Sequence, residues 1–80
     1  MYLTKINIPT ESYAYEGNFF VEVQYDDEEI SVYLYDVTNI VKMLMFRLPI
    51  DDVQSEEYIV NYIELNIRKY IDKYIEKYYN

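Results

Sequence analysis

The last third of the chain carries apolar side chains with the period of an α-helix, from residue 51 to residue 79. No proline or glycine interrupts this run, and Pro49 blocks a helix immediately before it. The pattern predicts one long amphipathic helix over 51–79, with Asp51 as its cap and Gln54 completing a capping box. The apolar stripe expected to face the core comprises Val53, Ile59, Val60, Ile63, Ile67, Tyr70, Ile71, Tyr74 and Tyr78.

A second, smaller apolar group lies nearly opposite this stripe. It consists of Tyr58, Tyr62 and Leu65, which follow the i, i+4, i+7 spacing of a helix contact surface. One interpretation is that these are single surface residues that cover lysine stems, since isolated exposed apolar side chains are common. The other interpretation is a dimer face or a face for another partner.

Period-two alternation predicts β-strands in the first half of the chain. A strand is expected over 2–8 and a short extended piece over 13–15, before a tight turn at Gly17 and Asn18. The clearest hairpin joins 19–25 to 30–36 through the acidic turn 26–29. Its core face is expected to carry Phe19, Val21, Val23, Tyr25, Ile30, Val32 and Leu34.

Residues 40–48 fit either a strand or a short helix capped by Thr38. We favour a strand, because nine residues are short for a helix and Pro49 ends the run. In that reading Met43, Met45 and Arg47 face away from the core, while Leu44, Phe46 and Leu48 face it.

The assembled prediction is an α+β fold, in which an antiparallel β-meander of three to four strands packs one face against the C-terminal helix. The chain forms a single domain over 1–80, with the sheet in 1–48 and the helix in 51–79. The outer face of the sheet is expected to be unusually aromatic for a surface that only meets water. It would carry Phe20, Glu22, Gln24, Ser31, Tyr33 and Tyr35, together with Met43, Met45 and Arg47.

Composition argues against most catalytic chemistry. The chain has no cysteine and no histidine, so it lacks disulfides, Cys/His nucleophile pairs and zinc-finger ligands. Its one glycine provides no phosphate-binding loop. We expect no enzyme activity, no cofactor and no metal centre. No secretion signal or membrane span is recognisable, which predicts a cytoplasmic protein without a membrane partner.

The charge distribution favours binding to a basic surface. Net charge is −8, and residues 1–36 hold eight acidic side chains against one lysine. This half would repel nucleic acid phosphates and attract a basic protein surface. Tyrosine makes up 12 of 80 residues, more than so small a core can hold, so several tyrosines must lie at the surface.

The turn 26–29 is the most concentrated acidic feature, and three interpretations are open for it. It is a solvated hairpin tip, a weak site for a divalent cation, or a knob that docks in a basic groove. In the docking interpretation, carboxylates imitate phosphates and neighbouring tyrosines occupy places where bases would stack. The candidate partner-binding residues are Glu22, Asp26, Asp27, Glu28, Glu29, Tyr33, Tyr35 and Asp36.

With its small size, acidic turn, lack of cysteine and tyrosines in the sheet half, the chain resembles phage-encoded inhibitors of host defence, notably anti-CRISPR proteins and other DNA mimics. The resemblance implies an inhibitor that blocks the basic nucleic-acid groove of a partner such as a CRISPR effector, in the host cytoplasm. It assigns no role to individual residues. The alternative is a self-associating structural or regulatory module.

Overall fold

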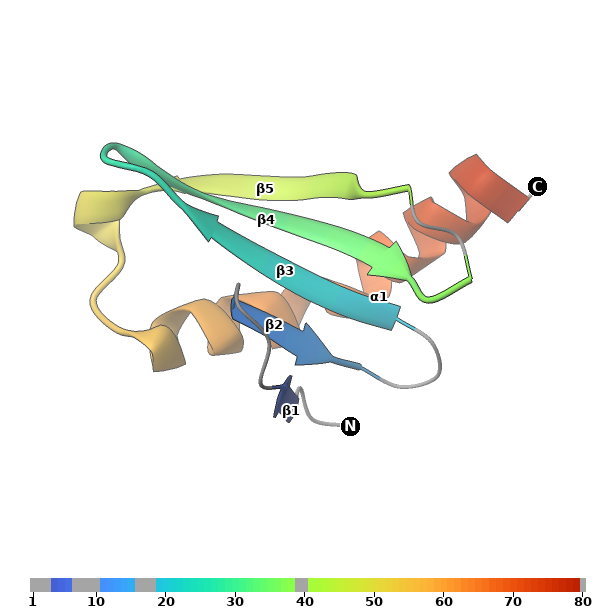
Figure 1. The fold of residues 1–80 in the computed structure, drawn as a ribbon, viewed down its shortest axis with the longest axis horizontal. Coiled ribbons are helices and arrows are strands. Elements are labelled where there is room, and N and C mark those ends of the chain that lie inside the picture. Colours follow the sequence, from blue (N-terminus) through green and yellow to red (C-terminus); the bar gives the residue numbers. More distant parts are fainter. Residues whose placement is uncertain (1–3, 7–10, 16–18, 39–40, 80) are drawn as a thin grey trace.

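The computed structural model describes residues 4–6, 11–15, 19–38 and 41–79. The elements, in chain order, are β1 (Thr4–Ile6), β2 (Glu11–Ala14), β3 (Phe19–Tyr25), β4 (Glu29–Asp36), β5 (Met43–Pro49), a 3₁₀ turn η1 (Ile50–Asp52) and α1 (Glu56–Tyr79). Figure 1 shows the strands side by side and the helix behind them. The turn predicted at Gly17 and Asn18 lies outside the described residues.

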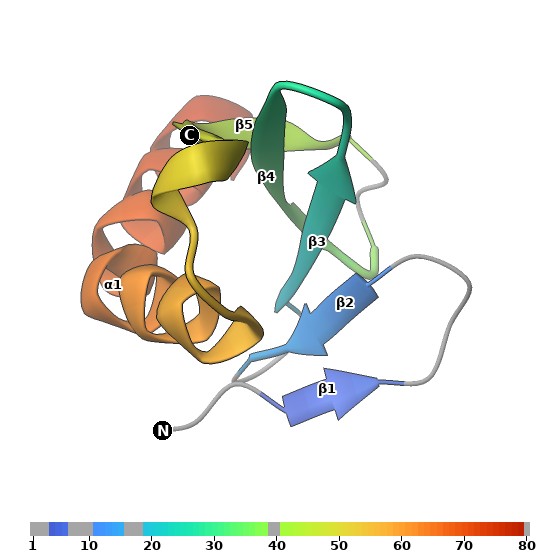
Figure 2. The same cartoon turned by 90° about the vertical axis from the view of Figure 1, so that its left-hand side faces the viewer.

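The sheet is a meander, since its strand order β1-β2-β3-β4-β5 follows the sequence and each described pair is antiparallel. The predicted α+β architecture is confirmed, and the sheet has one strand more than the upper expectation. Viewed from the end in Figure 2, α1 covers one side of the twisted sheet. The other side of the sheet carries no helix in the described part of the chain.

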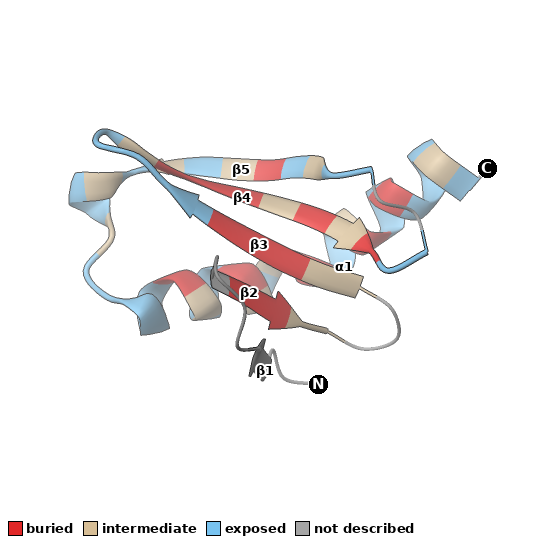
Figure 3. Ribbon diagram, in the orientation of Figure 1, coloured by how far each residue is buried: buried red, intermediate tan, exposed pale blue. Residues whose placement is uncertain are grey.

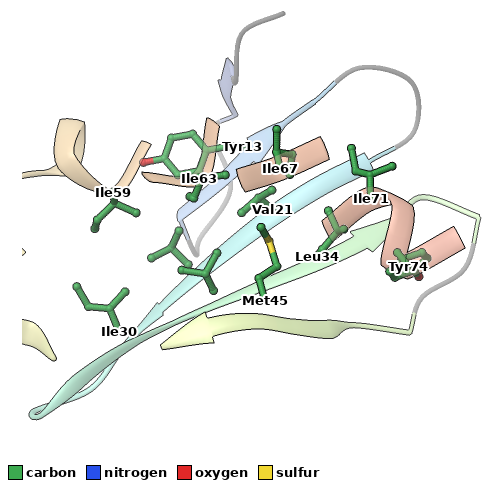
Figure 4. Packing of buried hydrophobic residues seen from close by; sticks show 12 residues of the cluster. Tyr13, Val21, Ile30, Leu34, Met45, Ile59, Ile63, Ile67, Ile71 and Tyr74 are labelled. Atoms are coloured by element: carbon green, nitrogen blue, oxygen red, sulfur yellow. The ribbon is translucent and has the colours of Figure 1, made fainter. Parts of the chain in front are cut away.

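The buried side of α1 matches the predicted stripe. Five of its residues are buried, namely Ile59, Ile63, Ile67, Ile71 and Tyr74. They pack on the inner faces of β3 and β4, from which Val21, Val23, Ile30, Val32 and Leu34 contribute. Figure 3 places these buried positions along the middle of the sheet and on the helix behind it, and Figure 4 shows their side chains converging on one core.

The helix begins later than the sequence predicts. Asp51 and Asp52 belong to η1, and α1 starts at Glu56. The cap is Ser55, because its hydroxyl accepts the backbone N–H of Tyr58 at 3.2 Å. The prediction that Asp51 caps the helix is therefore wrong, since the chain uses those residues to turn from the sheet edge toward the helix.

Residues 43–49 form a strand, as the favoured interpretation predicts, but alternation fails within it. The register shifts between Val32 and Tyr33 of β4, so that Phe46 lies opposite Val32 and Leu44 opposite Tyr33. Met45 is the extra residue of this bulge. Met45 is buried, Met43 packs against the core and Leu44 is exposed, which is the reverse of their predicted faces.

Candidate protein-interaction surfaces

The turn between β3 and β4 is built around the side chain of Asp26. Its Oδ1 accepts the backbone N–H groups of Glu28 and Glu29, each at 2.7 Å. These two hydrogen bonds hold the pKa of Asp26 below its usual value, because they favour the charged carboxylate. The bond from Glu29 has the larger effect. Asp26 therefore shapes the tip of the hairpin as well as adding negative charge to it.

The other acidic side chains of this turn differ in whether they pair with another side chain. Glu29 forms an exposed ion pair with Arg47, in which Oε1 of Glu29 lies 3.6 Å from Nε of Arg47. Asp27 and Glu28 are exposed at the tip. No hydrogen bond or ion pair of the Asp27 and Glu28 side chains with other described residues is found, so both face solvent.

A second acidic segment lies beside this turn. Pro49 pairs with Glu29, and the backbone N–H of Ile50 donates to Glu28 O at 2.9 Å. These contacts bring η1, with its exposed Asp51 and Asp52, next to the hairpin tip. Figure 1 shows the two segments together at one end of the molecule. We call this surface the acidic end; it consists of Asp26, Asp27, Glu28, Glu29, Asp51 and Asp52.

Asp51 and Asp52 were not among the residues predicted for partner binding, because their position after a proline and before a helical run is typical of a helix start. The expected pairing of 40–48 with the preceding strand is the sequence feature from which the position of Asp51 and Asp52 could be inferred. A strand that pairs antiparallel with β4 ends beside the residue at which β4 begins. The residues that follow Pro49 therefore lie next to the turn 26–29.

Glu22 lies on the outer face of the sheet but is largely covered, with 7% of its surface exposed. Its Oε2 accepts Gln24 Nε2 and Lys42 Nζ, both at 2.8 Å. The same lysine ammonium lies 5.7 Å from the centroid of the Tyr35 ring. Glu22 is thus a mostly buried carboxylate paired with the exposed side chains of Gln24 and Lys42, which leaves little of it for a partner.

The aromatic side chains predicted for the outer face are present there. Tyr35 stacks on Phe20, with ring centroids 5.6 Å apart, and Tyr33 lies between Glu22 and Leu44 in neighbouring strands. Tyr33 and Tyr35 are both half-buried. They form an apolar layer over the sheet at a distance from the acidic end.

Asp36 lies at the end of β4, opposite Phe19, and is 4% exposed. The hydroxyl of Tyr79 donates to its Oδ2, and that of Thr38 donates to Oδ1 at 3.3 Å. The hydrogen bond to Asp36 is the main cause that raises the pKa of Tyr79 above its ordinary value. Asp36 therefore ties the end of α1 to the sheet, and the structure separates it from the other predicted acids.

The three residues predicted as an alternative dimer face lie on the outside of α1. Tyr58 and Tyr62 are 38% and 37% exposed, while Leu65 is 84% exposed. The Tyr62 ring packs against Phe46 of β5 with centroids 4.7 Å apart, so one of its sides belongs to the fold. Leu65 contributes nothing to the core.

Among the described residues, no group of three or more acidic side chains is arranged to hold a metal ion. None of the helices in the described ranges has the length and hydropathy needed to cross a membrane. Comparisons with protein-family models, with curated proteins and with solved structures found no match for this chain.

Proposed function

We propose that this protein binds a partner protein through the acidic end and blocks a basic surface that the partner uses to hold nucleic acid. The observation that carries the proposal is the gathering of two acidic segments, far apart in the sequence, at one end of the molecule. Arg47 is the basic residue described in contact with this group, through Glu29.

Such a surface suits a basic groove for electrostatic reasons. Like charges held together on a rigid turn create a field that extends into solvent by about 10 Å at 0.1 M salt. A partner with a basic groove would be drawn to that field, and association would be fast and salt-dependent. Nucleic acid would compete for the same groove, because its affinity also depends on phosphate contacts.

The rigidity of the turn supports recognition as well as attraction. Asp26 fixes two backbone N–H groups, and η1 is hydrogen-bonded to the tip through Ile50. Exposed carboxylates on a preorganised segment lose less conformational entropy on binding than those on a loose loop. The resemblance to anti-CRISPR proteins points to a nucleic-acid-processing enzyme, such as a CRISPR effector, as the class of partner.

The test compares two double charge reversals. Asp27→Lys with Glu28→Lys changes the acidic end, whereas Asp72→Lys with Glu76→Lys changes the helix. All four residues are exposed, and each pair replaces one aspartate and one glutamate, so the change in net charge is equal. The immobilised variants are exposed to lysate of the native host, and retained proteins are eluted with salt or with duplex DNA and single-stranded RNA.

The proposal predicts a nucleic-acid-binding protein that wild type and the helix variant retain, and that the acidic-end variant loses at least tenfold. Salt and nucleic acid should both elute it. Retention that is equal in the two variants, or that nucleic acid does not compete, would contradict the proposal.

A further inference from the structure

The outer side of α1 carries a seam with the spacing of a coiled coil. Tyr58, Tyr62 and Leu65 are followed by Lys69, Asp72 and Glu76, so that the steps alternate between four and three residues. This is the repeat by which two helices keep one side facing each other. The seam is apolar in its first half and charged in its second half.

At the centre of this seam the fold uses one side of the Tyr62 ring, which packs against Phe46, and leaves Leu65 outside the core. Ile63, two positions before Leu65, is fully buried, whereas Leu65 is 84% exposed on the opposite side of α1. The rings of Tyr58 and Tyr62 lie next to each other with centroids 6.5 Å apart, and both remain over one-third exposed. The three side chains therefore form one continuous apolar surface on a rigid helix.

Charge along α1 indicates what covers this surface. Residues 56–66 hold three acids and no base, whereas residues 67–79 hold four bases and two acids. A parallel pair of such helices would place like charges together, whereas an antiparallel pair places the acidic half of one against the basic half of the other. Glu56 is hydrogen-bonded to Tyr13 of its own sheet, so the acid that gains most from the antiparallel orientation is Glu57, which then lies near Arg68 of the second copy.

We infer that a second copy of this chain packs antiparallel against the outer side of α1, about a two-fold axis between Tyr62 and Leu65. In this arrangement Tyr62 contacts Leu65 of the second copy, and the reverse contact follows from the symmetry. Tyr58 then meets Lys69 of the second copy, where an ammonium over a ring is favourable. Tyr58, Tyr62, Leu65 and Lys69 all lie outside the acidic end, so the inference does not rest on the proposed function.

The interface is small, since it consists of one helix side from each copy. It belongs with the weak and transient class, and the dimer should form in the micromolar to millimolar range. Sedimentation equilibrium over about 1 µM to 1 mM covers that range of dissociation constants.

The first test replaces Leu65→Glu and, as a matched control, Val37→Glu. Both residues are exposed and apolar, at 84% and 58%, and both changes add one negative charge. Leu65→Glu should weaken dimerisation at least tenfold, whereas Val37→Glu should dimerise like wild type. A wild-type protein that stays monomeric up to 1 mM, or equal losses in both variants, would overturn the inference.

The second test determines whether the two copies of α1 run parallel or antiparallel. The chain has no cysteine, so Leu65→Cys and Glu76→Cys each introduce a single thiol. In the antiparallel dimer the two thiols of Leu65→Cys lie near the axis, whereas residue 76 of one copy lies about 37 Å from residue 76 of the other, at 1.5 Å per residue. A short bis-maleimide should link Leu65→Cys and leave Glu76→Cys unlinked; linking of both would show a parallel pair instead.

Discussion

At the residue scale, identical carboxylates have different roles in this molecule. Asp26 binds the backbone of its own turn, Glu22 pairs with Lys42, and Asp36 accepts the hydroxyl of Tyr79. Asp27 and Glu28, by contrast, are exposed and make no side-chain hydrogen bond or ion pair within the described part of the chain. The chemistry of each acid thus depends on which distant group reaches it.

The Tyr79–Asp36 contact predicts a dependence of stability on alkaline pH. The pKa of Tyr79 is raised from 10.0 in the folded state, so folded chains hold the phenol proton more tightly than unfolded ones. The contribution of this contact to stability is therefore fully present below about pH 10 and is lost as pH rises through the raised pKa of Tyr79. Tyr79→Phe should remove part of this loss, measured by urea unfolding between pH 9 and 11.

The control for this measurement is Tyr58→Phe, which deletes an exposed hydroxyl that is remote from Asp36. Its pH profile should follow wild type. Identical slopes in all three proteins would assign the alkaline loss of stability to groups other than Tyr79.

At the element scale, the start of α1 and the bulge of β5 show where local patterns stop being informative. Ser55 and Asp51 are both good capping residues, and a proline before Asp51 makes it the natural choice. The choice of Ser55 follows from η1, whose backbone is engaged with the hairpin tip. The bulge at Met45 likewise shows only in the fold, where Met45 belongs to the core shared with α1 and Phe46 packs on Tyr62.

The two capping candidates can be separated by substitution. Ser55→Ala should lower the free energy of unfolding by about 1 kcal/mol, because the N–H of Tyr58 loses its partner. Asp51→Ala should change it by less than about 0.5 kcal/mol, as expected of an exposed residue away from a cap. Chemical denaturation at pH 7 measures both, and a larger loss in Asp51→Ala would restore the sequence-based assignment.

At the scale of the whole molecule, stability rests on one helix packed on one sheet. So small a chain buries only about 60% of its unfolded surface, so each core contact is a large share of the total. The buried isoleucines of α1 face the valines of β3 and β4, and Tyr13 of β2 adds a hydrogen bond to Glu56 at 2.8 Å. The acidic end lies outside this core.

Ile63→Ala and Leu65→Ala test this division of α1. Ile63 is fully buried, so its truncation should cost about 2–5 kcal/mol, through lost burial and the cavity left behind. Leu65→Ala should cost less than about 0.5 kcal/mol when measured at low micromolar concentration, where a weak dimer is dissociated. Equal losses would mean that Leu65 is part of the core, and would remove the basis for the dimer.

Sequence patterns alone predict the class of fold, the hairpin 19–36, the core face of the helix and most of the acidic tip. These features depend on side-chain periodicity within a few residues, which period-two and helical patterns report directly. Tyr58, Tyr62 and Leu65 could be assigned to the outside of the helix for the same reason.

Long-range packing sets the faces of Met43 and Met45, the burial of Glu22 and Asp36, and the proximity of residues 26–29 to Asp51 and Asp52. Each depends on a contact between separate segments of the chain, namely the bulged strand pair, the ion pair with Lys42, the hydrogen bond from Tyr79 and the hydrogen bond from Ile50 to Glu28. Local periodicity carries no information about such contacts, because they are selected by the packing of the whole chain.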